Sequence, residues 1–256
     1  LNTMEKTDIH ASPYPVHLKF DTGMNRLGFH KNDLEPLIEM LKSSNRIQIK
    51  SIFSHLAASE DPALDPFTMR QFKIFQSICE RLEEQFDYPI IKHILNSAGI
   101  ERFPDFQYDM VRLGIGLYGF SAIEAKELTG VTRLKSIISQ IKEIRKGETI
   151  GYGRMGKLKE GSRIAIVPIG YADGLNRRLG NGIGQMYVNE SPVPIIGNIS
   201  MDMCAIDISG LDVSEGDMIS VYSDNSQITK LANDLQTIPY EILTGISQRV
   251  KRIYYQ

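Results

Sequence analysis

The segment VHLKFDTGMNRLGF, residues 16–29, contains Asp21, Thr22 and Gly23, the tripeptide that carries the reactive carboxylate of aspartic proteases. A protease of that class pairs two such carboxylates so that they share one proton. The chain has no second DTG or DSG, and Met24 follows the first tripeptide where a protease usually has Ser or Thr. We therefore expect Asp21 to organise a loop after a strand rather than to act as a protease acid.

The segment GIGLYG, residues 114–119, matches the GxGxxG pattern of dinucleotide-binding folds. Such a fingerprint should open a domain after its first strand and lead into a helix, whereas this one follows three other strand-like runs. Glycines at the end of a late barrel strand can instead offer backbone N–H groups to a phosphate. Ser97 and Gly99, in ILNSAGI, end the preceding strand-like run. The two strand ends together predict a phosphate-binding cup.

The five histidines show no HxH or HExxH spacing, so the sequence predicts no metal site. His55 ends a strand-like run, at the position where barrel enzymes keep their chemistry, although a structural role for a lone histidine is the more common alternative. The two cysteines, Cys79 and Cys204, lie far apart without CxxC spacing. They are typical of reduced, buried thiols in a cytoplasmic protein.

The composition of this 256-residue chain, 42% hydrophobic and 23% charged, is that of a globular protein. A formal net charge of −2 gives no reason to expect nucleic acid or an anionic membrane as partner. The longest apolar runs, such as IAIVPIG at 164–170, fall short of the roughly 20 residues of a membrane span.

Residues 1–127 alternate strand-like runs with helical patterns, which predicts parallel βα units. The runs are 16–20, 47–56, 88–96 and 110–119. One helix is indicated by apolar residues at helical spacing, namely Leu34, Leu37, Ile38 and Leu41. A second should begin at Asp65 as N-cap with Pro66 in the first turn. Its apolar stripe comprises Phe72, Phe75, Cys79, Leu82 and Phe86.

Residues 128–256 consist mainly of short β-rich runs separated by turns, which predicts an antiparallel β domain that ends with a short helix and a last strand. A closed (β/α)₈ barrel typically needs about 250 residues. At roughly 30 residues per unit, only about four units precede the β domain. The first part is therefore either a small open sheet or the back half of a barrel.

The strand ends, taken in order, resemble the bacterial alanine racemases. The resemblance runs from about residue 15 to the end and rests on LKFDTGMNRLGF, FSHLAASE, LNSAGIERFP, VRLGIGLYG, IGYGRMG, VPIGYADGLNRRL, IGNISMDMCAIDIS and IPYEILTGISQRVKRIY. That family has a (β/α)₈ barrel that binds pyridoxal 5′-phosphate (PLP), followed by a β domain. It works as a homodimer with shared active sites. The resemblance implies interconversion of L- and D-alanine for peptidoglycan synthesis.

The resemblance also assigns cofactor contacts. It implies that Arg112 faces the pyridine nitrogen of PLP, and a permanently charged guanidinium would keep that nitrogen unprotonated. By the same resemblance, the phosphate is held by Ser97, the backbone of Gly114 and Ile115, and Tyr240.

Catalytic and substrate contacts follow from the same resemblance. Tyr152 matches the tyrosine that moves the α-proton on one face of the substrate. A phenol with a pKa of about 10 needs cationic or hydrogen-bonding neighbours for that role, and His55 and Arg112 match the residues that supply them. The substrate contacts implied are Arg26 near the carboxylate, Met201 from the other subunit, and Tyr171 and Arg177 at the entrance. Lys19 matches a lysine that some relatives carbamylate.

One expected residue is missing. The family's first barrel strand carries a lysine that binds PLP covalently and acts as the second acid/base, and residues 1–14 contain no such motif. We therefore expect this chain to be the carboxyl-terminal part of a racemase and inactive by itself. The alternatives are a non-catalytic fragment that dimerises, or another PLP enzyme such as a broad-spectrum amino-acid racemase or a decarboxylase. Related decarboxylases usually place a carboxylate at the pyridine nitrogen, and Arg112 argues against them.

Overall fold

The structure is a computed structural model that describes residues 13–123 and 128–255. The chain divides into two compact units, residues 1–129 and 130–256. The boundary predicted between residues 127 and 128 adjoins residues 124–127, which lie outside the described part. Within the described residues, no helix has the length and apolar character that crossing a membrane requires.

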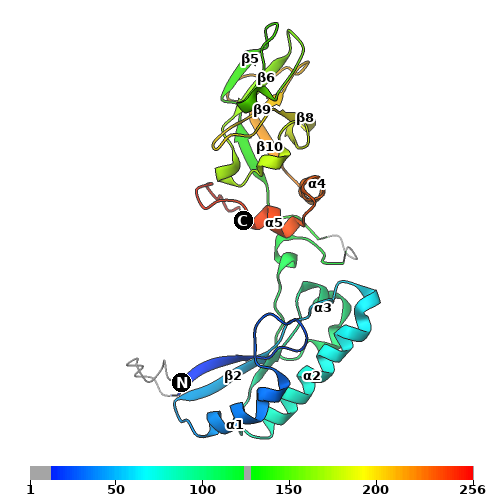
Figure 1. The fold of residues 1–256 in the computed structure, drawn as a ribbon, viewed down its shortest axis with the longest axis vertical. Coiled ribbons are helices and arrows are strands. Elements are labelled where there is room, and N and C mark those ends of the chain that lie inside the picture. The colour runs from blue at the N-terminus through cyan, green and yellow to red at the C-terminus, as the bar shows by residue number, and fades with distance from the viewer. Residues whose placement is uncertain (1–12, 124–127, 256) are drawn as a thin grey trace. The chain divides into compact units, whose positions relative to one another are not determined.

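The first unit contains a parallel sheet of β1 (Tyr14–Lys19), β2 (Ile47–Phe53) and β3 (Ile91–His93), in that order. The connections carry α1 (Leu34–Lys42) and α2 (Asp65–Glu83), as Figure 1 shows. The expected strand–helix alternation is therefore confirmed for these units. The pairing register places Lys19 beside Phe53 and Phe53 beside His93. These three side chains form a row across one face, because neighbours paired in register point to the same side of a sheet.

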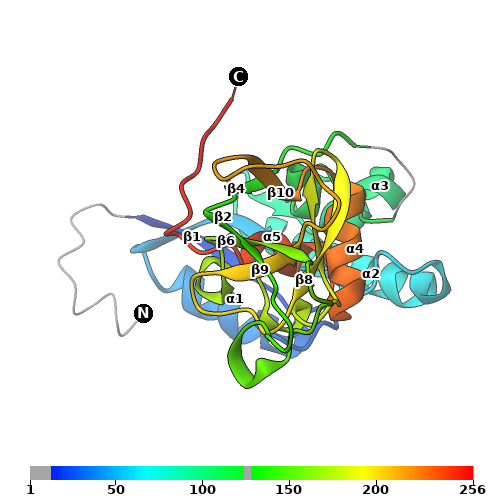
Figure 2. The same ribbon diagram turned by 90° about the horizontal axis from the view of Figure 1, so that it is seen from above.

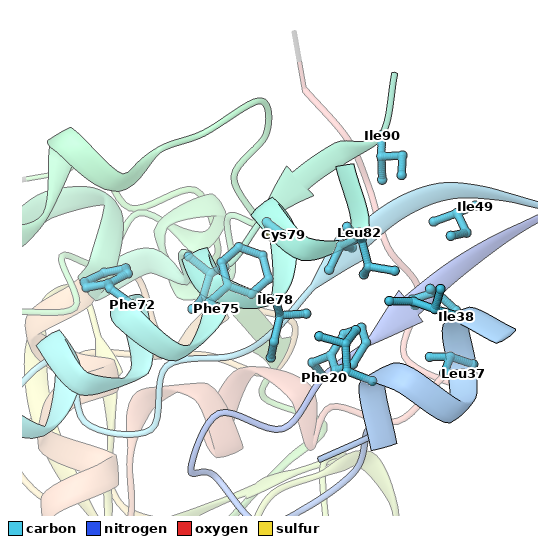
Figure 3. Close-up of a cluster of buried hydrophobic side chains, with 14 of the residues drawn as sticks. Phe20, Leu37, Ile38, Ile49, Phe72, Phe75, Ile78, Cys79, Leu82 and Ile90 are labelled. Carbon is cyan, nitrogen blue, oxygen red and sulfur yellow. The ribbon is translucent and has the colours of Figure 1, made fainter. Parts of the chain in front are cut away.

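The core of this unit is formed by apolar side chains of the strands and of both helices. Leu37 and Ile38 of α1 pack with Phe20 at the end of β1 and Ile49 of β2, and Phe75 of α2 joins them (Figure 3). The predicted stripe of α2 is confirmed for its members within the helix, which are buried. Each fully buried aliphatic or aromatic side chain contributes roughly 1.5–3 kcal/mol to folding.

Three local expectations for this unit were wrong. The second helix begins at Asp65 with Leu64 as N-cap, and the Asp65 carboxylate accepts a hydrogen bond from Arg102 instead of capping the helix. The run 88–96 pairs as a strand only over β3. The run 110–119 forms no strand, because only Asp109 and Arg112 donate backbone bonds towards the β3 segment, and a 3₁₀ turn, η5 (Ile115–Tyr118), follows. The remaining short elements are α3 (Ser97–Arg102), η2 (Lys31–Asp33), η3 (Pro62–Leu64) and η4 (Pro104–Phe106).

The second unit is a seven-stranded sheet in the order β4-β10-β7-β8-β9-β6-β5, with every pair antiparallel. Figure 2 shows that its strands curl round rather than lie flat. The strands are β4 (Leu134–Ile137), β5 (Gln140–Glu143), β6 (Arg163–Val167), β7 (Gln185–Val188), β8 (Ser191–Ile196), β9 (Cys204–Asp207) and β10 (Met218–Tyr222). The expected antiparallel β domain is confirmed.

Two helices and three 3₁₀ turns complete the second unit. They are α4 (Asn225–Leu235), α5 (Pro239–Thr244), η6 (Tyr152–Arg154), η7 (Tyr171–Asp173) and η8 (Arg177–Leu179). The short helix expected near the end is α5, whereas the last strand was wrong, since residues 251–255 form no strand. We did not predict α4, although Asp224 caps it by accepting from the backbone N–H of Gln227.

Candidate functional site

Arg112 lies at the centre of the polar cluster in the first unit. Its Nη1 donates to Nδ1 of His93 at 2.5 Å and its Nη2 to Nδ1 of His55 at 3.1 Å. Nη2 also donates to the carbonyl of Ser54 at 2.6 Å, and the backbone N–H of Arg112 donates to Leu95 O at 3.1 Å. The structure thus brings Arg112 and His55 together as the resemblance implied. His93 is a third member that we did not predict, although it ends β3 much as His55 follows the end of β2.

Both histidines of the cluster are neutral at physiological pH. Burial, followed by the charge of Arg112, lowers the pKa of His55 to about 4. The same two causes lower the pKa of His93 to about 4. Since Nδ1 of each ring accepts from Arg112, each neutral ring carries its hydrogen on Nε2. Nε2 of His93 is buried and has no partner among the described residues.

Lys19 and Arg26 add positive charge to the same end of the sheet. The Lys19 ammonium lies 5.6 Å from the Phe53 ring centroid, and the Arg112 guanidinium lies 5.5 Å from it. Burial first, then the charges of Arg26 and Arg112, hold the pKa of Lys19 below its ordinary value, while Asp21 opposes the shift. Three cations close to one carboxylate favour an anionic ligand. Carbamylation of Lys19 stays a prediction.

Asp21 shapes the loop that follows β1. Its Oδ1 accepts from the backbone N–H of Gly23 at 2.8 Å and its Oδ2 from that of Arg26 at 3.0 Å. Burial opposes ionisation, but these backbone hydrogen bonds outweigh it and lower the pKa of the Asp21 carboxyl. The loop-organising role predicted for Asp21 is confirmed. Asn25, within this loop, has φ of 55°, a conformation that asparagine tolerates better than most residues.

Ser97 joins the two strand ends predicted to form a phosphate cup. Its Oγ accepts from the backbone N–H of Gly114 at 2.9 Å and from that of Gly116 at 3.3 Å. A hydroxyl that accepts two such bonds still has its own hydrogen to donate. Ile115 lies between the two glycines at the start of η5. The structure brings Ser97 and Gly114 together, and it adds Gly116, which we did not predict.

Tyr152 begins η6 in the second unit and is 71% exposed. The turn is built from Gly151 and Gly153, whose φ values of 73° and 68° disfavour other residues. The amide of Asn198 donates to Tyr152 O at 2.9 Å. The backbone of this turn is therefore fixed while the phenol stays accessible within the unit.

Tyr171 and Met201 lie on two backbone segments that cross closely. Tyr171 N donates to Ser200 O at 3.1 Å, and Ala172 N donates to Met201 O at 3.0 Å. The crossing requires glycine at position 170, because a Cβ there would lie 2.3 Å from Met201 O. The structure thus places these two predicted substrate contacts on adjoining segments.

Arg249 ties the same two segments together from the C-terminal stretch. Its Nε donates to Asp173 Oδ1 at 2.7 Å and its Nη2 to Asp202 Oδ1 at 2.5 Å. The hydrogen bond from Arg249 lowers the pKa of the Asp173 carboxyl. Arg249 is a further residue that we did not predict.

Arg177 and Tyr171 both line a cavity of about 480 Å³ in the second unit, together with aliphatic residues of α4 and β10. Tyr240 lies on α5 and is partly exposed. The structure therefore brings Tyr171 and Arg177 together, while Tyr240 lies outside this lining. Among the residues described, no group of three or more His, Cys, Asp or Glu side chains could hold a metal ion.

Comparison with known proteins relates both units to one family. The family model "Alanine racemase, N-terminal domain" matches residues 1–122, and "Alanine racemase, C-terminal domain" matches residues 131–254. Alanine racemase 1 of Oceanobacillus iheyensis is 37% identical over 252 residues, which cover 93% of this chain and 66% of that protein. The alanine racemase of Methanococcus maripaludis is 38% identical, and the match covers 98% of this chain and 68% of that protein.

Solved structures give the same result. Alanine racemase from Bacillus anthracis with bound L-Ala-P has a TM-score of 0.90 at 30% identity, covering all of this chain and 68% of that one. Alanine racemase from Bartonella henselae with covalently bound pyridoxal phosphate has a TM-score of 0.81 at 34% identity, and the match covers 95% of this chain and 67% of that one. The chain spans about two thirds of the length of these relatives. The chain shares with these relatives the predicted architecture, a barrel-type parallel unit followed by an antiparallel β domain.

Proposed function

The chain belongs to the alanine racemase family, and we propose that the whole protein interconverts L- and D-alanine with PLP as cofactor. The observation that carries the proposal is the hydrogen-bonding of one arginine, Arg112, to two neutral histidines at the end of a parallel sheet. A decarboxylase of similar architecture usually has a carboxylate in the place of Arg112.

The residues of the first unit fit PLP. The phosphate is a dianion that needs N–H and O–H donors, and Ser97, whose Oγ accepts from the N–H groups of Gly114 and Gly116, keeps its own hydroxyl hydrogen to donate. The cluster of Lys19, Arg26 and Arg112 supplies the positive charge that an anionic cofactor and a substrate carboxylate would neutralise. When bound, PLP would withdraw electrons from the substrate and acidify its α-proton.

Arg112 is the residue that we propose to face the pyridine nitrogen. Burial lowers the pKa of its guanidinium, yet an arginine keeps its proton throughout the physiological range. His55 and His93 accept from Arg112 and so hold the guanidinium in one orientation. A fixed donor that gives up no proton limits the electron withdrawal by PLP, which favours proton transfer over side reactions.

The second unit supplies the proton-transfer and substrate residues in this proposal. Tyr152 gives or takes the α-proton on one face of the substrate, and its exposed phenol suits a group that acts on a molecule outside its own unit. Met201 lines the substrate pocket, Tyr171 and Arg177 form the entrance, and Tyr240 contacts the phosphate. Arg26 of the first unit binds the substrate carboxylate.

We further propose that the protein is a cytoplasmic homodimer with shared active sites that supplies D-alanine for peptidoglycan. Tyr152 and Met201 are 71% and 53% exposed, which suits residues covered by a second copy. The two cysteines are buried and free, as suits a reducing compartment.

The experiment that tests the proposal is a chiral assay of the whole protein loaded with PLP, given L-alanine, L-serine and L-glutamate in separate reactions. We expect D-alanine to form fastest. Faster turnover of another amino acid would assign a broader or different racemase, and release of CO₂ would assign a decarboxylase.

A further inference from the structure

Gln71 is a glutamine of α2 that is completely buried, with 0% of its side chain exposed. Its Oε1 accepts from the backbone N–H of Ala57 at 2.9 Å. Its Nε2 donates to His55 O and to Thr22 Oγ1, each at 3.1 Å. Both Nε2 hydrogens and one Oε1 lone pair are thus engaged, and every partner belongs to a loop that follows β1 or β2.

Hydrogen bonds connect the partners of Gln71 to the Arg112 cluster. Thr22 Oγ1 lies 2.8 Å from Ser54 Oγ, and Ser54 O accepts from Arg112 Nη2 at 2.6 Å. Thr22 also adjoins Asp21, whose carboxylate holds the backbone of Arg26. The Gln71 amide therefore joins the loop that carries Arg26 to the loop that carries His55.

An ordinary core position would not require this arrangement. A buried amide must have its hydrogen bonds made, at a cost of roughly 1–3 kcal/mol for each group left unpaired, so an aliphatic residue is the simpler way to fill a helix–sheet interface. Here the apolar face of α2 is already supplied by Phe72, Phe75 and Leu82. Thr68 and Gln71 are the buried polar residues of α2, and Gln71 is the one whose hydrogen bonds join the loops after β1 and β2.

We propose that Gln71 is a positioning residue. It sets the distance between the Arg26 loop and His55, and thereby keeps His55 in position to accept the hydrogen bond from Arg112. Its importance for turnover rests on the proposed function. Its effect on the geometry of His55 does not, so the test below requires neither cofactor nor activity.

The test is the titration of His55, followed by ¹H–¹⁵N NMR of the full chain with labelled histidine. Burial, and then the charged groups that face His55, namely Arg112, Arg26 and Lys19, hold its pKa at about 4. The first variant is Gln71→Met, which keeps the length of the side chain and removes its hydrogen bonds. The second is Thr22→Val, which keeps the shape and removes the bridging hydroxyl. The matched control is Gln76→Met, on the exposed side of the same helix, where the native amide donates to Glu80.

We expect the His55 pKa to rise by a unit or more in Gln71→Met, towards the ordinary value of about 6.5, and by less in Thr22→Val. The control should titrate as the native chain does. If Gln71→Met fails to fold, the titration of His55 in Thr22→Val decides whether the proposal holds. The proposal is overturned if every variant that folds gives the native His55 titration, or if Gln76→Met shifts it equally.

Discussion

Arg112 donates from one guanidinium nitrogen, Nη2, to both Nδ1 of His55 and the carbonyl of Ser54, the residue before it. His55 is thus held by its ring and by the adjoining backbone at once. The hydrogen bond also fixes the tautomer, because a ring nitrogen that accepts from arginine cannot carry a hydrogen itself. Proton transfer at the site would therefore involve His55 only through Nε2.

The stability of the first unit should depend on this pair of neutral histidines. The folded-state pKa of His55 and His93 is about 4, below the unfolded value of about 6.5. Between these values the unfolded chain binds more protons than the folded chain. The stability that the two neutral histidines contribute is therefore fully present above pH 6.5 and is lost as the pH drops towards 4. We expect a loss of about 1–3 kcal/mol between pH 7 and pH 5, after allowing for solvent screening.

Urea unfolding followed by circular dichroism at the two pH values measures this loss. His55→Gln should weaken the pH dependence, and His30→Gln, at an exposed histidine of the same unit, should leave it unchanged. An equal dependence in both variants would show that His55 contributes nothing to it.

The phosphate cup can be tested by removing its hydroxyl. Ser97→Ala takes away both the acceptor of two backbone N–H groups and the hydrogen offered to the phosphate. We expect the Kd for PLP, measured by fluorescence titration of the chain, to rise at least about tenfold, since hydrogen bonds to charged groups contribute roughly 1.5–3 kcal/mol. Ser43→Ala, at the exposed end of α1, serves as the control. Equal affinities of the two variants would place the phosphate elsewhere.

Arg249 should stabilise the crossing of the Tyr171 and Met201 segments. Arg249→Gln breaks both ion pairs, and since the side chains of Arg249 and Asp202 are about half exposed, we expect only a small fall in the free energy of unfolding. The sharper readout is hydrogen exchange, which should speed up at the amides of Tyr171 and Ala172. Arg178→Gln, at a nearby exposed arginine, should leave their exchange unchanged. Slow exchange in Arg249→Gln would show that the backbone bonds hold the crossing without it.

The chain by itself should lack the covalent attachment of PLP. We propose this because no segment of these 256 residues resembles the lysine-bearing strand with which the family binds PLP. Borohydride reduction of the chain with PLP, followed by peptide mapping, should therefore label no single lysine specifically, and the chain alone should not racemise alanine. One specifically labelled lysine together with turnover would show that the chain is competent by itself.

The architecture and much of the site could be predicted from the sequence because their signals are local. The apolar spacing of Leu34 to Leu41 is a helix period, and the alternation of such helices with β-branched runs indicates parallel pairing. Asp21, Ser97 and His55 were recognised because each ends a strand-like run, where the carboxyl ends of parallel strands meet.

What the sequence could not reveal depends on contacts between distant segments. GIGLYG reads as a strand by composition, yet the backbone geometry of Gly114 and the turn at Ile115 end the extended run. Gln71 looks like any polar helix residue until the loops at Thr22 and Ala57 are seen around it. The roles of Arg249 and His93 likewise depend on hydrogen bonds to partners more than 15 residues away in the sequence.

The central proposal, alanine racemisation with Tyr152 as one of two acid/base groups, is tested most directly by exchange of the α-proton in D₂O. The whole protein with PLP should convert either enantiomer to the other with deuterium at the α-carbon. Tyr152→Phe should lose racemisation by about 10²-fold or more but still exchange the proton of one enantiomer. Tyr187→Phe is the control, because Tyr187 lies on β7 and its hydroxyl accepts from the Gln185 amide of the same strand. Native racemisation by Tyr152→Phe, or none by the native protein, would contradict the proposal.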